Sequence, residues 1–335
     1  METIHLTNIF LLATAAFGVA MLATPAWTHV LYKYRFGKRL RTTGVGGDAP
    51  VFKELHAAKA GTPTMGGLLI WVTVALVTLA FNMDRGETWL PLFTLVAVGM
   101  IGAADDYLNI KGIGSAGGGI RVRHKLVAQL VIGAVGAWWF FSKLGYTFLH
   151  VPGVGDFDIG LFYIPLFILA MVATTNAVNI TDGLDGLAGG LLIIAFVAFG
   201  ALSYVNGLFA LAAFCGTIAG ALLAFLWFNI HPARFFMGDT GSMALGATLA
   251  VVAALNDALL ILPIIGLVFV AETLSVIIQL SSRRFAGRKL FRSTPIHHHF
   301  EAIGWPETKV TMRFWIIGAV FAVIGLVLGV IGRGS

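Results

Sequence analysis

The stretch 208–228, LFALAAFCGTIAGALLAFLWF, decides the fold class because it is apolar from end to end. It contains no Asp, Glu, Lys or Arg, and a helix needs about 20 such residues to cross the hydrocarbon core of a bilayer. The stretch therefore predicts a transmembrane helix.

The composition of the whole chain agrees with a membrane protein. Of the 335 residues, 58% are hydrophobic and 11% are charged, whereas soluble domains carry about 25% charged residues. This excludes a water-soluble globular protein, a disordered chain and a coiled coil. The single cysteine, Cys215, rules out an intrachain disulfide and a Cys/His zinc site. In a membrane protein, the net charge of +6 indicates basic residues that set the orientation of the helices and contact lipid headgroups. We do not interpret it as a sign of nucleic-acid binding.

Nine further apolar segments resemble the stretch 208–228. We therefore predict an all-α polytopic membrane protein with about ten transmembrane helices. We treat residues 1–335 as one membrane domain. The N-terminal segment, 8–31, is interpreted as a retained helix, since the residues before it lack the basic residues of a signal peptide. The ten predicted segments are 8–31, 64–82, 89–104, 126–142, 159–178, 187–204, 208–228, 241–256, 258–281 and 312–332.

The basic residues predict the orientation of these helices. All but three of the 22 Lys and Arg residues fall on one side of the predicted bundle, the exceptions being Arg85, Lys143 and Arg333. Because Lys and Arg favour the cytoplasmic side, we expect both termini on the outer, periplasmic side. Many carboxylates also fall on the cytoplasmic side, as a site that handles anions with a metal would require.

Five polar stretches on the predicted cytoplasmic side carry most of the chemical signal. Each also has a plainer interpretation: a solvated helix end for Asp105 and Asp106, a turn for 176–186, a helix N-cap for Asp239 and a surface tract for the histidines. The stretches are HAAKAGTPTMGG at 56–67, DDY at 105–107, NAVNITDGLDG at 176–186, NIHPARFFMGDTG at 229–241 and TPIHHHFE at 294–301.

The residue types in these stretches favour phosphate chemistry with a divalent cation. Asp105 and Asp106 end an apolar segment, where a helix dipole disfavours anions, so a cation would compensate them. Aspartate oxygens favour Mg²⁺ or Mn²⁺ over zinc. Lys59 and Lys125 either contact lipid headgroups or bind a phosphate or pyrophosphate substrate. Glu272, inside a predicted span, is interpreted as structural and paired with a polar group in the bundle.

Taken together, the Asp-Asp pair, NxxNxxDGxDGLA and GDTGS resemble the polyprenyl-phosphate N-acetylhexosamine-1-phosphate transferase superfamily. HxxKxGTPTMGG and TPIHHHFE resemble its phospho-N-acetylmuramoyl-pentapeptide transferase (MraY) family. The resemblance covers nearly the whole chain and implies ten spans and a homodimer in the bacterial plasma (inner) membrane. It also implies a Mg²⁺-dependent enzyme that converts UDP-MurNAc-pentapeptide and undecaprenyl phosphate to lipid I and UMP, the first membrane step of peptidoglycan synthesis.

Two other functions remain open. A related enzyme would transfer GlcNAc-1-phosphate to the same lipid, although the histidine triplet and TPTMGG argue against it. A secondary transporter would use membrane carboxylates near the midplane, whereas those of this chain gather at one predicted face, apart from Glu272. An ATP-driven pump is disfavoured because the chain has no Walker A pattern.

By motif, the resemblance assigns a role to each candidate residue. Asp239 would bind Mg²⁺, and Asp105 would either deprotonate the lipid phosphate or attack as a nucleophile. Lys125 would meet the phosphates, and Phe236 would stack on uracil. The uridine pocket would be formed by Lys59, Thr64, Asp185, Asn229 and Phe236. The implied catalytic residues are Asp105, Asp106, Asp239 and His298, and the implied substrate-binding residues are Lys59, Thr64, Lys125, Asn176, Asn179, Asp182, Asp185, Asn229, Phe236, His297 and His299.

Two departures from the family pattern leave phosphate contacts open in one loop. Asn109 stands where many relatives place a basic residue, and the loop 112–119 is unusually rich in glycine. Lys111 could substitute for the missing charge, but its register is open.

Overall fold

The computed structural model describes residues 2–37, 43–44, 47–48, 59, 61–114 and 118–332. Two short antiparallel hairpins accompany the helices, β1 (Thr43–Gly44) with β2 (Gly47–Asp48), and β3 (Phe148–Val151) with β4 (Gly155–Asp158). A 3-10 turn, η2 (Gly160–Phe162), leads into α6. The helices are α1 (Glu2–Lys33), α3 (Gly67–Phe81), α4 (Trp89–Lys111), α5 (Val122–Lys143), α6 (Tyr163–Thr181), α7 (Leu187–Val205), α8 (Phe209–Asn229), α9 (Asp239–Leu255), α10 (Leu262–Ile265), α11 (Leu267–Ala286), α12 (Ile296–Ala302) and α13 (Glu307–Ile331).

The helices confirm a polytopic, α-helical membrane protein. Each of the ten predicted apolar segments is helical, although the segment 258–281 is divided into α10 and α11 at Gly266. Seven described helices, α1, α4 to α8 and α13, are long and apolar enough to cross a membrane, while α3 and α9 are apolar but shorter. The count of ten spans and the orientation of the termini stay predictions.

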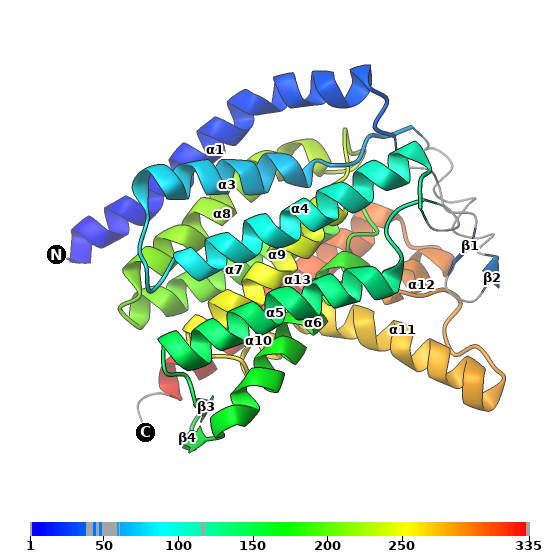
Figure 1. Ribbon diagram of the computed structural model, residues 1–335. Helices are drawn as coiled ribbons and strands as arrows, with labels where there is room; N and C mark the ends of the chain where they lie inside the picture. The colour runs from blue at the N-terminus through cyan, green and yellow to red at the C-terminus, as the bar shows by residue number, and fades with distance from the viewer. Residues whose placement is uncertain are drawn as a thin grey trace.

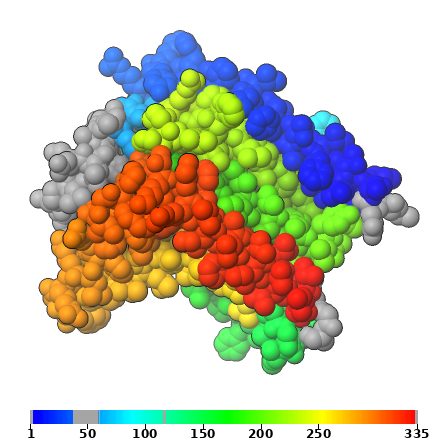
Figure 2. Space-filling model, turned by 180° about the vertical axis from the view of Figure 1, so that it is seen from behind, coloured from blue at the N-terminus to red at the C-terminus, as the bar shows by residue number. Residues whose placement is uncertain are grey.

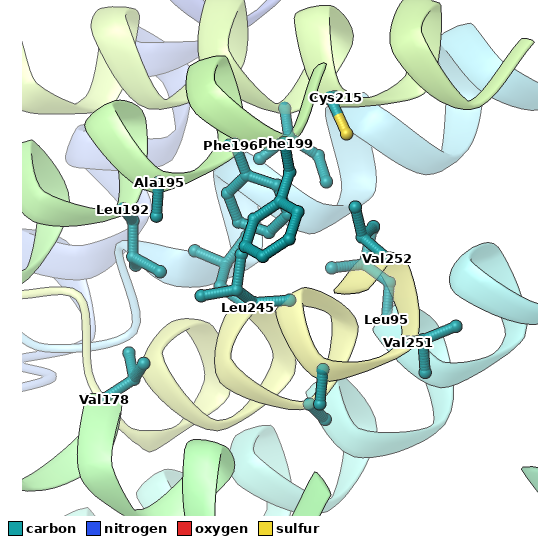
Figure 3. Close-up of a cluster of buried hydrophobic side chains, with 14 of the residues drawn as sticks. Leu95, Val178, Leu192, Ala195, Phe196, Phe199, Cys215, Leu245, Val251 and Val252 are labelled. Atoms are coloured by element: carbon teal, nitrogen blue, oxygen red, sulfur yellow. The ribbon is translucent and has the colours of Figure 1, made fainter. Parts of the chain in front are cut away.

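The core is built around α9, whose residues Thr240 to Leu255 are all buried. It packs against α4, α6 and α3 (Figure 1). Small residues on the helix allow this close approach: a Cβ added at Gly246 would lie 2.8 Å from the carbonyl oxygen of Thr174 in α6. Figure 3 shows Phe196 and Phe199 of α7 beside Leu245 and Val252 of α9. A helix so enclosed is held by protein rather than by lipid, which explains its Ala- and Gly-rich sequence.

The connections gather at the two ends of the bundle. The start of α1 and the end of α13 lie at the same end, together with the β3–β4 hairpin (Figure 1), where Gly153 N donates to Gly332 O at 3.3 Å. The opposite end holds α12, the start of α13 and the connections before α3, α5, α7 and α9. Figure 2 shows α13 running across one face and α11 projecting from the body at that opposite end.

Candidate functional site

Backbone pairing fixes the approach of two polar stretches at this opposite end. The segment before α3 and the segment before α9 run beside each other. Phe236 N donates to Pro63 O, Gly66 N to Phe236 O and Gly67 N to Met237 O, each at 2.8 Å. This ladder holds residues 63–67 against the stretch that precedes Asp239.

Asp239 lies at the centre of one charged cluster. As the first residue of α9, it accepts from Lys125 Nζ at 2.9 Å through Oδ2 and from Asn179 Nδ2 at 3.0 Å through Oδ1. Lys125 also donates to Asp105 Oδ2 at 3.2 Å, and Asp105 Oδ1 accepts from Ile120 N at 2.6 Å. Four helices, α4, α5, α6 and α9, thus bring two carboxylates, an ammonium and an amide together.

Asp106 supplies the cap of α9 from another helix. Its oxygens accept from Asp239 N at 3.2 Å and Thr240 N at 3.1 Å, two of the donors that a helix start leaves unpaired. Gly238, with φ of 77°, permits this approach, because a Cβ there would lie 2.4 Å from Asp106 Oδ2. Asp239 therefore does not act as the N-cap, and its carboxylate remains turned toward Lys125 and Asn179.

The helix-dipole argument for Asp105 and Asp106 was wrong. The apolar segment stops at 104, but α4 continues to Lys111 and ends at Gly112, which has a left-handed φ of 69°. The two carboxylates thus lie within the helix, more than one turn before its end. Tyr107, in the continuing turn, is half exposed. What makes these carboxylates unusual is their burial, with 2% and 4% exposed.

The residues around Asp239 fit a divalent cation. Helix α9 offsets the charge of Asp106 through its N-terminal N–H groups. Asp105 and Asp239 both bind the Lys125 ammonium in a partly buried site, where a divalent cation would add positive charge beside the two carboxylates. Carboxylate and amide oxygens are the donors that Mg²⁺ prefers. The carboxylates of Asp239 and Asp105 could hold such an ion, next to Asn179, whose Nδ2 donates to Asp239.

A second charged cluster lies beside the Phe236 ring. Lys59 Nζ donates to Asp185 Oδ1 at 2.7 Å and to Glu307 Oε1 at 2.5 Å, and His231 Nδ1 lies 3.0 Å from Asp185 Oδ2. Ligand atoms of Asp185, His231 and Glu307 lie within 4.8 Å of one another, which would suit a metal. The Lys59 ammonium lies between these two carboxylates, just as the Lys125 ammonium lies between Asp105 and Asp239, so charge alone does not distinguish the two clusters. The assignment of the ion to Asp239 stays a prediction from the motif.

Sequence reasoning missed His231 and Glu307. His231 stands inside the stretch 229–241, so a signal was present, although no role was given to it. The sequence did not mark Glu307 as a site residue. A glutamate in the first turn of a helix is common, because it interacts favourably with the helix dipole.

The aromatic and amide residues of the predicted uridine pocket lie near this second cluster. The Phe236 ring is half-buried, and its centroid is 5.9 Å from Lys59 Nζ. Buried Asn229 accepts from Gly186 N at 3.0 Å and donates to Phe235 O at 2.9 Å, so it ties two connections together. The buried Thr64 Oγ1 has no hydrogen-bond partner among the residues described.

The three histidines of α12 point to different partners, as their adjacency requires. His297 is fully buried, with Nδ1 3.0 Å from Glu272 Oε2, which confirms the pairing expected for Glu272 inside the bundle. His298 Nδ1 lies 2.6 Å from Glu301 Oε2, and His299 Nδ1 accepts from Arg292 N at 3.2 Å. The His297 ring packs against Gly183, so it lies beside the polar connection after α6.

The remaining candidates occupy the α6 side and the loop before α5. Asn176 donates to Gln129 Oε1 at 2.8 Å and to Val172 O at 2.7 Å, while half-buried Asp182 follows the end of α6. Within loop 112–119, residues 115–117 lie outside the described residues. Gly118 packs against buried Asn109 and Gly119 against Asp105, so residues 118 and 119 lie beside one carboxylate of the Asp239 cluster.

Residues 88–256 match the model of glycosyl transferase family 4, and residues 59–70 match phospho-N-acetylmuramoyl-pentapeptide-transferase signature 1. The chain is 41% identical over 340 residues to the phospho-N-acetylmuramoyl-pentapeptide-transferase of Chloroflexus aurantiacus, covering 97% of this chain and 90% of the relative. The chain belongs to the phospho-N-acetylmuramoyl-pentapeptide-transferase family. It is thus an enzyme of the transferase class.

Two further members of this transferase family show that the likeness extends over nearly their full length. The transferase of a Geobacillus strain is 41% identical over 321 residues, covering 94% of this chain and 96% of the relative. The transferase of Clostridium perfringens is 40% identical over 319 residues, covering 95% of this chain and 97% of the relative. The signature match begins at Lys59, and the glycosyl transferase match includes Asp105, Lys125 and Asp239.

Proposed function

We propose that this chain transfers phospho-MurNAc-pentapeptide from UDP-MurNAc-pentapeptide to undecaprenyl phosphate, giving lipid I and UMP. The observation that carries the proposal is the Lys125 ammonium held between Asp105 and Asp239 at one end of a membrane bundle. Such a site can join a water-borne nucleotide sugar to an acceptor lying in the bilayer. Membership of the transferase family supports the choice of substrates.

The reaction is a phosphoryl transfer in which positioning and charge do most of the work. An oxygen of the lipid phosphate attacks the β-phosphorus of the UDP-sugar, and the bond from that phosphorus to the bridging oxygen breaks, releasing UMP. Lys125 would bind the diphosphate, and Asp105 would lie beside the attacking phosphate. A Mg²⁺ ion held by Asp239 would neutralise charge on the transferred group.

Direct attack by the lipid phosphate is favoured over a phospho-enzyme formed on Asp105. A phosphate monoester has a second pKa of about 6, so the acceptor is already ionised at neutral pH and needs little help from a base. Exchange of labelled UMP into UDP-MurNAc-pentapeptide without any lipid acceptor would contradict direct attack.

We propose further that the chain is a multi-pass protein of the bacterial plasma membrane, with ten spans, both termini outside and the site facing the cytoplasm. The charge bias of the loops supports this orientation. So does the position of the start of α1 and the end of α13 at the end opposite the site (Figure 1). A single domain over 1–335 and a homodimer complete the proposal.

A donor-competition assay tests this function. Purified protein in undecaprenyl phosphate micelles with Mg²⁺ receives equal UDP-MurNAc-pentapeptide and UDP-GlcNAc, and lipid products and UMP are measured. The proposal expects the muramoyl donor to be used. Preference for UDP-GlcNAc would favour the related sugar transferase, and solute uptake into liposomes without UMP release would favour a transporter.

A further inference from the structure

Glu307 joins three parts of the site that are distant in sequence. It is the first residue of α13, and its side chain is 11% exposed. Oε1 accepts from Lys59 Nζ at 2.5 Å and from Asp185 N at 2.6 Å, and Oε2 lies 3.4 Å from His231 Nδ1. One carboxylate therefore contacts the stretch before α3, the connection after α6 and the connection before α9.

These contacts are not those of a helix start. The N-cap position of α13, Pro306, provides no side-chain hydrogen bond, so the first N–H groups of the helix have no cap of that kind. Glu307 turns both oxygens toward other segments instead. A carboxylate that served only the start of α13 would lie beside its own first turn.

The contacts instead control the position of Lys59. A lysine has a long, flexible stem, and a single carboxylate leaves its ammonium several positions. Asp185 and Glu307, from separate elements, bind the same Nζ at 2.7 and 2.5 Å, and this places it 5.9 Å from the centroid of the Phe236 ring. The ammonium and the aromatic face thus stand at a fixed separation before any ligand arrives.

We propose that Glu307 is a positioning residue for the nucleotide-sugar donor, which acts by fixing Lys59 and the Asp185 backbone beside the Phe236 ring. This inference rests on the proposed function, and it assigns Glu307 no contact with the reacting phosphates. Since preorganisation of a binding group lowers the cost of binding, its loss raises the KM for the donor and leaves the chemical step in place.

The test is the variant Glu307→Gln, which keeps an acceptor but removes the charge that holds Lys59. We expect a KM for UDP-MurNAc-pentapeptide about tenfold higher, since hydrogen bonds to charged groups are the stronger ones. The kcat stays within about twofold. The matched control is Glu87→Gln, because Glu87 also binds a backbone N–H, that of Leu211 at 2.9 Å, but outside the site. Its KM stays at the wild-type value.

A double-variant cycle separates positioning from a general loss of stability. If Glu307 acts through Lys59, then Glu307→Gln adds little to the KM of Lys59→Met. Independent, multiplied effects would overturn the inference. Should Glu307→Gln fail to fold, Glu307→Asp, whose shorter carboxylate cannot reach both donors, takes its place with the same expected rise in KM.

The outcomes distinguish the inference from the proposed function. A wild-type protein that releases no UMP from UDP-MurNAc-pentapeptide overturns the proposed function. A wild-type protein that turns over while Glu307→Gln keeps its KM overturns the positioning role alone. A fall in kcat without a change in KM also overturns it, because Glu307 would then act on the chemical step.

Discussion

Gly102→Ala tests whether the spacing of α4 and α9 sets the geometry of the Asp239 cluster. A Cβ at Gly102 would lie 2.4 Å from Asp239 O and 2.6 Å from Thr240 Cα, where ordinary contact begins at 3.4 Å. The first turn of α9 must therefore move by about 1 Å, and a displacement of that size at a reacting centre costs about 100-fold in rate. The Lys125 contact with Asp239, now 2.9 Å, would lengthen beyond a good hydrogen bond.

The assay compares kcat at saturating donor with thermal unfolding in the same detergent. We expect kcat to fall by about 100-fold. Overpacking of this kind costs about 1–3 kcal/mol of stability, so the variant remains folded. Gly18→Ala in α1 is the matched control, because its Cβ would meet nothing within 4 Å. Activity of Gly102→Ala within twofold of wild type would refute the argument that close helix packing positions Asp239.

Three other predictions concern single side chains. Asp239→Ala should lower kcat by about 1,000-fold or more and leave the melting temperature nearly unchanged; turnover like that of the wild type would remove Asp239 from the site. Phe236→Ala should raise the donor KM by about 5- to 150-fold, since lost stacking costs about 1–3 kcal/mol, and an unchanged KM would contradict the assignment. Burial raises the pKa of the Glu87 carboxyl above its usual value of 4.5, against the opposing effect of the Leu211 N–H. The folded protein therefore holds the proton of the Glu87 carboxyl more tightly than the unfolded chain does. The protonated carboxyl stabilises the fold at low pH, and this stabilisation is lost as pH rises through the pKa of the folded state. Glu87→Gln should therefore gain in melting temperature over wild type as pH rises, and a difference independent of pH would count against it.

The helices could be predicted because membrane helices are long apolar segments with few charged residues, which the sequence shows directly. The stretch 208–228 corresponds to α8 within one residue at each end. Boundaries set by packing could not be predicted: polar Glu272, Ser275 and Gln279 are buried in α11, which does not count among the seven apolar spans. A hydropathy pattern does not show which polar residues in a helix face protein.

The candidate site was predictable by residue type, but its connections were not. The quoted stretches contain Asp105, Asp239 and Asp185, since such carboxylates are rare at a membrane edge. That Asp106 caps α9, or that Glu307 holds Lys59, follows only from contacts between elements distant in sequence. Local patterns carry no information on such pairs.

The most direct test of the account is the position of the metal ion. Crystals grown with Mn²⁺ and a UDP-sugar analogue would reveal the ion by anomalous scattering. The account predicts one ion at about 2.0–2.2 Å from an Asp239 carboxylate oxygen, beside Asp105 and Lys125. An ion held instead by Asp185, His231 and Glu307, with none at Asp239, would contradict it.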